Sequence, residues 1–120
     1  MNITHLDLQV SDVPLHTSFF ERVFGLKRVT KPGSPAIAIL EDDAGFVLVL
    51  QKLKEGDHFP DGFHLGFHVA DAEAVSRMRD KALSEGVQVS DVIVNARGTT
   101  IYCTAPDGFW VEVTARAVKS

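Results

Sequence analysis

Hydrophobic and polar side chains alternate along residues 3 to 10, with Leu6 and Val10 on one face and His5 and Asp7 on the other. A period of two is typical of a strand that buries one of its faces. The chain therefore predicts an opening strand whose polar face carries an imidazole and a carboxylate.

The hydrophobic period then changes from two to about four. Leu15, Phe19 and Val23 recur at this spacing between Asp12, a typical N-cap residue, and a glycine that ends the run. The pattern predicts an amphipathic helix that buries these three side chains and leaves His16 on its solvated polar side.

The same order of elements occurs twice in the chain. Residues 4 to 12 align without gaps on residues 63 to 71, and residues 45 to 49 align on residues 108 to 112. The second half therefore predicts a second helix, starting after Asp71. Short strands are predicted over residues 26–30, 36–41, 46–53, 63–69, 88–94, 99–104 and 109–115.

These elements predict the α+β class, with two tandem β-α-β-β-β modules in one domain spanning residues 1 to 120. The first module covers about residues 1–54, the second about residues 63–120, and a polar, turn-rich linker at 55–62 joins them.

Composition narrows the function classes. The formal net charge is −4, and Lys and Arg are scattered, so neither nucleic acid nor a membrane surface is an expected partner. No signal peptide or membrane span is recognisable, and Cys103 is the single cysteine, which favours a cytoplasmic protein. Cys103 shares the apolar parity of Ile101 and is predicted to be a structural thiol.

Three segments carry a family resemblance: HLDLQVSD, FFERVFGL and APDGFWVEV. With their order along the whole chain, they resemble the vicinal oxygen chelate superfamily, which includes glyoxalase I, extradiol dioxygenases, fosfomycin-resistance enzymes and bleomycin-binding proteins. The resemblance implies a cup-shaped mixed β-sheet with the helices on its outer face, a small-molecule substrate or ligand, and a homodimer.

The repeat indicates where a metal would bind. His5 and His64 occupy equivalent strand positions, as do Val49 and Glu112, so the four should converge in the cup. The resemblance implies metal coordination at these positions; Val49 removes one ligand and leaves two imidazoles and a carboxylate. That set suits Fe(II), Mn(II), Ni(II) or Zn(II) with open positions for substrate.

Other side chains on the same face receive alternative interpretations. His68 could act as a base or be a polar lining residue, and the Tyr102 hydroxyl could contact substrate or serve packing. Trp110 could form an aromatic wall for a ligand or fill the cup. Thr100 and Val49 are expected to contact substrate.

Three hypotheses of function follow. The first is a small metal-dependent enzyme, a dioxygenase, lyase or isomerase that chelates vicinal substrate oxygens through His5, His64 and Glu112. The second is a metal-free dimer that binds an antibiotic or another small molecule. The third is a structural or regulatory protein with an inert cup.

Overall fold

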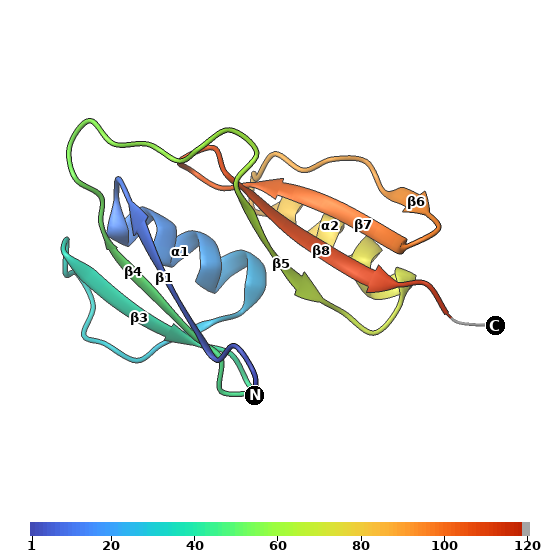
Figure 1. Cartoon of the computed structure of the whole chain (residues 1–120), viewed down its shortest axis with the longest axis horizontal. Coiled ribbons are helices and arrows are strands. Elements are labelled where there is room, and N and C mark those ends of the chain that lie inside the picture. Colours follow the sequence, from blue (N-terminus) through green and yellow to red (C-terminus); the bar gives the residue numbers. More distant parts are fainter. Residues whose placement is uncertain (119–120) are drawn as a thin grey trace. The chain divides into compact units, whose positions relative to one another are not determined.

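The chain folds into two compact units, each built from one mixed sheet and one helix (Figure 1). The computed structural model describes residues 1–118. Unit 1 is Met1–His58 and unit 2 begins at Phe59, so the division falls inside the predicted linker. The α+β class and the two β-α-β-β-β modules are confirmed.

Unit 1 holds a four-stranded sheet in the order β1-β4-β3-β2. Its elements are β1 His5–Val10, α1 Val13–Phe24, β2 Lys27–Arg28, β3 Ile37–Glu41 and β4 Val47–Lys52. Strands β1 and β4 are parallel, and the other neighbours are antiparallel. The ladder between β2 and β3 includes only Lys27 and Arg28 of β2, so the strand predicted over residues 26–30 is reduced to two residues.

Unit 2 repeats this topology in the order β5-β8-β7-β6. Its elements are β5 His64–His68, α2 Ala72–Ser84, β6 Ile93–Asn95, β7 Gly98–Thr104 and β8 Trp110–Arg116. The strand predicted over residues 88–94 is interrupted, because Arg79 donates to the Ser90 carbonyl at 2.9 Å and to Asp91 Oδ1 at 3.3 Å. Only the bridge from Val89 to Cys103 and the short β6 remain.

Both helices begin at the predicted caps. Asp12 Oδ1 accepts a hydrogen bond from the Leu15 amide at 3.0 Å, and Asp71 Oδ1 accepts one from the Ala74 amide at 2.8 Å. Each bond satisfies an amide that has no partner inside its helix. Gly25 ends α1 at a φ of 70°, a left-handed conformation that glycine adopts without a steric penalty.

The buried face of α1 differs from the prediction at two positions. His16 is fully buried, whereas Leu15 is 52% exposed, so the expectation of a solvated His16 is wrong. Phe20, one position after the expected Phe19, is also buried. The buried face of the helix is therefore rotated toward His16. The His16 Nδ1 lies 2.8 Å from the Asp12 carbonyl, and this hydrogen bond satisfies a ring nitrogen taken out of water.

In unit 2, alternate residues of β7 and β8 pack against α2. Ile101, Val111 and Val113 are buried on this face together with Cys103. Burial raises the pKa of the Cys103 thiol from 9.0 to about 11, as expected for an unreactive structural thiol.

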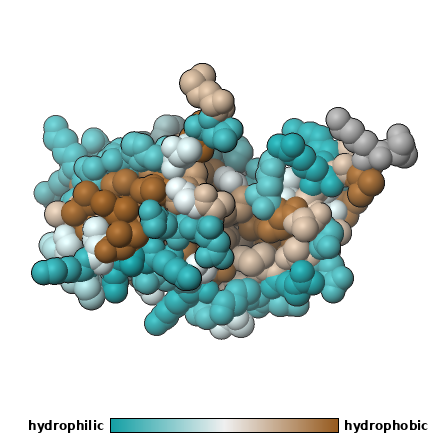
Figure 2. Space-filling view, turned by 90° about the horizontal axis from the view of Figure 1, so that it is seen from below, coloured by the Kyte–Doolittle hydropathy of each residue, from teal (hydrophilic) through white to brown (hydrophobic). Residues whose placement is uncertain are grey.

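The surface mixes polar and apolar side chains, and apolar ones emerge in separate groups between hydrophilic ones (Figure 2). Within residues 1–118, no helix has both the length and the apolar character needed to cross a membrane.

Candidate functional site

The face of the unit 2 sheet opposite α2 carries the predicted site residues. Strand alternation places His64, Gly66 and His68 of β5 on this face, beside Glu112 of β8 and Tyr102 of β7. In the ladder, Gly66 pairs with Glu112, and Glu112 pairs with Tyr102. The three strands therefore bring these side chains together.

A cavity of about 1050 Å³ opens on this face. Five predicted site residues line it, namely His64, His68, Thr100, Tyr102 and Glu112. Thr114, Arg97 and Arg116 also line the cavity. Unit 2 thus brings these five predicted site residues together along one cavity.

One ring nitrogen of His64 is engaged by the backbone. Its Nδ1 lies 2.9 Å from the Gly62 carbonyl oxygen, and since a carbonyl only accepts, Nδ1 is the donor in this bond. In the neutral ring this arrangement leaves the lone pair on Nε2. A histidine held in this way is already in the tautomer that ligates a metal through Nε2.

Glu112 leans over the neighbouring strand at Gly66. A Cβ at position 66 would lie 3.3 Å from the Cβ, the backbone oxygen and Oε2 of Glu112. Such contacts are tight, so the missing side chain gives the carboxylate its place over β5. Thr114 Oγ1 donates to Glu112 Oε1 at 3.4 Å, which leaves Oε2 available to a ligand.

Aromatic rings stand beside the histidine. The Tyr102 ring lies edge-on to His64, with centroids 6.3 Å apart, and its centroid is 5.7 Å from that of Trp110. Trp110 is 46% exposed, so it offers an apolar surface to solvent rather than filling a core. Thr100 and Thr114 hydrogen-bond through their hydroxyls farther along the sheet.

Unit 1 carries His5 and Val49, the other two of the four residues that were expected to converge. His5 pairs with Val47 as His64 pairs with Trp110, and Asp7 pairs with Val49 as Gly66 pairs with Glu112. The alignment of the two halves is therefore confirmed in register. Val49 is 8% exposed on the face opposite α1, at the position equivalent to Glu112.

Asp7 occupies the position equivalent to Gly66. Its Oδ1 accepts from the Gln9 amide at 2.7 Å, and its Oδ2 accepts from the Gln51 amide at 2.8 Å. The open face of unit 1 thus has a carboxylate on β1 and an apolar side chain on β4, whereas unit 2 has glycine on β5 and a carboxylate on β8. Sequence reasoning assigned no role to Asp7.

The three predicted metal ligands are of types that bind divalent ions, but they belong to different units. Across residues 1–118, no three His, Cys, Asp or Glu side chains form a group that could hold an ion. Unit 2 contributes two suitable donors, the Nε2 of His64 and the carboxylate of Glu112, and His5 belongs to unit 1. An imidazole and a carboxylate suit first-row divalent ions.

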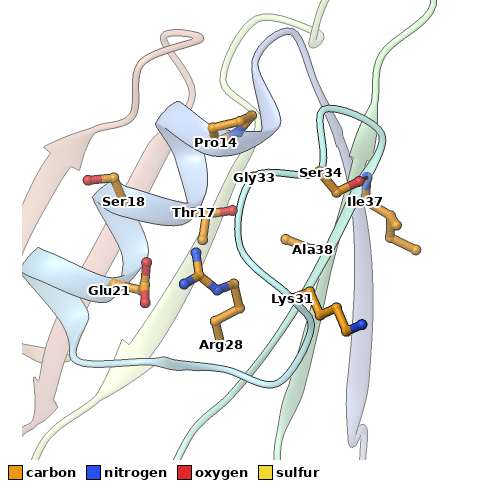
Figure 3. Close-up of a pocket in the computed structure, with 10 residues that line it drawn as sticks. All are labelled: Pro14, Thr17, Ser18, Glu21, Arg28, Lys31, Gly33, Ser34, Ile37 and Ala38. Atoms are coloured by element: carbon orange, nitrogen blue, oxygen red, sulfur yellow. Dashed lines mark hydrogen bonds between the residues drawn. The ribbon is translucent and has the colours of Figure 1, made fainter.

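A second, smaller cavity lies in unit 1 between α1 and the segment leading into β3 (Figure 3). Its volume is about 110 Å³, and Glu21 and Arg28 point toward one another across it (Figure 3). No pattern in the sequence predicted this cavity, because it depends on the path of the loop over residues 29–36.

The chain belongs to the Glyoxalase/Bleomycin resistance protein/Dioxygenase superfamily, whose family model matches residues 2–113. A possible glyoxalase from Bacillus cereus has 34% sequence identity and a TM-score of 0.81; the alignment covers 95% of this chain and 98% of that one. No curated protein matches the chain.

Two further structures share the fold at lower identity. Lactoylglutathione lyase from Agrobacterium tumefaciens has 19% identity and a TM-score of 0.78, over 95% of this chain and 92% of that one. A fosfomycin resistance protein from Listeria monocytogenes has 18% identity and a TM-score of 0.78, over 98% and 95%.

Proposed function

We propose that the protein is a small metal-dependent enzyme of this superfamily, with His5, His64 and Glu112 as ligands of one divalent ion. The observation that carries the proposal is that two of these ligands are already positioned for metal binding. His64 is fixed in the ligating tautomer by the Gly62 carbonyl, and Glu112 has its place over β5 because residue 66 lacks a side chain.

A bound divalent ion would supply Lewis-acid polarisation of two neighbouring substrate oxygens. The chain's own groups then position the substrate and handle its protons. The hydroxyl of Tyr102, beside His64 and opposite Glu112, donates a hydrogen bond to a substrate oxygen. His68, on the same cavity wall, accepts or returns the proton that the reaction moves. Thr100 and Val49 contact the substrate, and Trp110 provides an aromatic wall.

Metal titration tests this proposal directly. Fe(II) without oxygen, Mn(II), Ni(II) and Zn(II) are titrated by calorimetry into the wild type, His64→Ala and the control His58→Ala. His58 is exposed and outside the cavity. One ion should bind to the wild type and to His58→Ala, and His64→Ala should lose the binding while its circular dichroism stays native, because His64 is not part of the core. Wild-type binding no stronger than that of His64→Ala would refute the proposal.

A metal-free dimer that binds a small molecule is the second candidate. The observation that favours it is the exposed Trp110 beside Tyr102. The two candidates separate in thermal melts, because a ligand that binds only the native state raises the melting temperature. An aromatic ligand should do so without added metal only in the second case.

A further inference from the structure

The small cavity of unit 1 is separate from the residues used in the proposed function. Helix α1 forms one wall, and the segment that joins β2 to β3 forms the other (Figure 3). None of the residues that line this cavity is a predicted metal ligand or substrate contact. A ligand bound here would therefore occupy a second site in the chain.

The segment between β2 and β3 is held in place at both of its ends. The Val29 amide donates to the Ile39 carbonyl at 2.8 Å, and Thr30 Oγ1 accepts a hydrogen bond from the Ile39 amide at 3.2 Å. At the other end, Ser34 Oγ accepts one from the Ile37 amide at 3.3 Å. The space between this segment and α1 is therefore bounded by backbone that the fold itself positions.

The cavity carries one charge of each sign. The Glu21 carboxylate on α1 and the Arg28 guanidinium on β2 are half-buried and point toward one another across it (Figure 3). The Lys31 ammonium is directed away from both groups (Figure 3). Within residues 1–118, neither Glu21 nor Arg28 forms an ion pair. Charged groups that are partly removed from water are stabilised by a charged partner, so a ligand that pairs with both is favoured.

The size of the cavity limits which ligand could pair with both groups. A cavity of about 150 Å³ accepts benzene, so the volume here, about 110 Å³, admits a molecule of about five non-hydrogen atoms. We propose that this cavity binds a small α-amino acid such as glycine, with the ammonium group at Glu21 and the carboxylate at Arg28. A simple anion would leave Glu21 without a partner, and a simple cation would leave Arg28 without one.

A ligand series tests the need for both charges. Glycine, acetate and methylammonium are titrated separately into the full chain without added metal, because amino acids chelate divalent ions, and binding is followed by NMR of the backbone amides. Glycine should bind at least about tenfold more tightly than acetate or methylammonium, because it alone engages both side chains. Phenylalanine, which exceeds the cavity volume, should bind at least about tenfold more weakly than glycine.

Three results of this series would overturn the proposal. Acetate that binds as tightly as glycine would show a simple anion site. Phenylalanine that binds as tightly as glycine would show a site that the cavity volume does not limit. No saturable binding of glycine would show that the cavity holds only water.

Substitution of each charged residue tests where glycine binds. Glu21→Gln and Arg28→Gln should each weaken glycine binding by at least about tenfold while circular dichroism stays native, because each variant removes one charged partner. The matched controls are Glu73→Gln on α2 and Lys27→Gln on β2, two exposed charges outside the cavity, and both should bind glycine as the wild type does. Unchanged affinity in Glu21→Gln or in Arg28→Gln would refute the assignment.

His64→Ala separates this site from the proposed metal site. His64 belongs to unit 2 and does not line the small cavity, so this variant should keep the wild-type affinity for glycine whether or not it loses metal binding. Loss of glycine binding in His64→Ala would contradict a second site in unit 1.

Discussion

Gly66→Ala is predicted to weaken metal binding without unfolding the protein. The added Cβ would lie 3.3 Å from three atoms of Glu112, one of them Oε2, so the side chain must move by a few tenths of an ångström. Metal–ligand distances tolerate about 0.2 Å, so affinity should fall by about tenfold, or about 1.4 kcal/mol.

Stability should change much less than affinity. Replacing a glycine by alanine in a strand reduces the freedom of the unfolded chain and contributes about 0.5–1 kcal/mol. The close contacts with Glu112 act in the opposite direction. The free energy of unfolding, measured in urea, should stay within about 1 kcal/mol of the wild type.

A double-mutant cycle shows whether the effect acts through Glu112. Metal affinity is measured by calorimetry in the wild type, Gly66→Ala, Glu112→Ala and the double variant. In the Glu112→Ala background the glycine change should have no further effect, because the displaced carboxylate is absent. An equal loss in both backgrounds, or no loss in either, would show that Gly66 does not position the carboxylate.

Three further predictions concern other parts of the chain. Val49→Glu should lower the free energy of unfolding of metal-free protein by about 1–3 kcal/mol in urea, because Asp7 is its cross-strand partner. Asp7→Gly/Val49→Glu should recover most of this loss; no recovery would contradict the equivalence of the two halves. The Cys103 pKa is about 11 in the native state and 9.0 when unfolded, so the free energy of unfolding should fall by up to about 3 kcal/mol as pH rises from 9 to 11. Cys103→Ala should lack that fall. Light scattering should give the mass of a homodimer at micromolar concentration, and a single-chain mass would refute this.

The repeat made the fold predictable. Both Asp caps and most strand bounds follow from patterns local to the chain, and the register of His5 and His64 follows from alignment of the halves. His16 could not be placed, because a one-position rotation of the helix depends on how Phe20 packs against the sheet. The length of β6 could not be predicted either, since it depends on Arg79 reaching across from α2.

Alternation along the strands predicted which residues share a face of the sheet. The five residues that line the cavity were placed correctly in this way, namely His64, His68, Thr100, Tyr102 and Glu112. It could not show what each side chain touches there. The bond from His64 to Gly62 depends on a turn before the strand. The role of Gly66 had one available signal, a glycine inside a strand, which often marks close approach by another group.

Asp7 and Gly66 occupy equivalent positions in the two units, and this difference restricts which side chains unit 1 can accept at Val49. A glutamate at Val49 alone would meet the Cβ and the carboxylate of Asp7, at the position where Gly66 leaves space for Glu112. The Asp7 carboxylate is held on this face by the side-chain amides of Gln9 and Gln51. A chain that gains a fourth metal ligand, a glutamate at position 49, therefore needs a second substitution at Asp7 to make room for it.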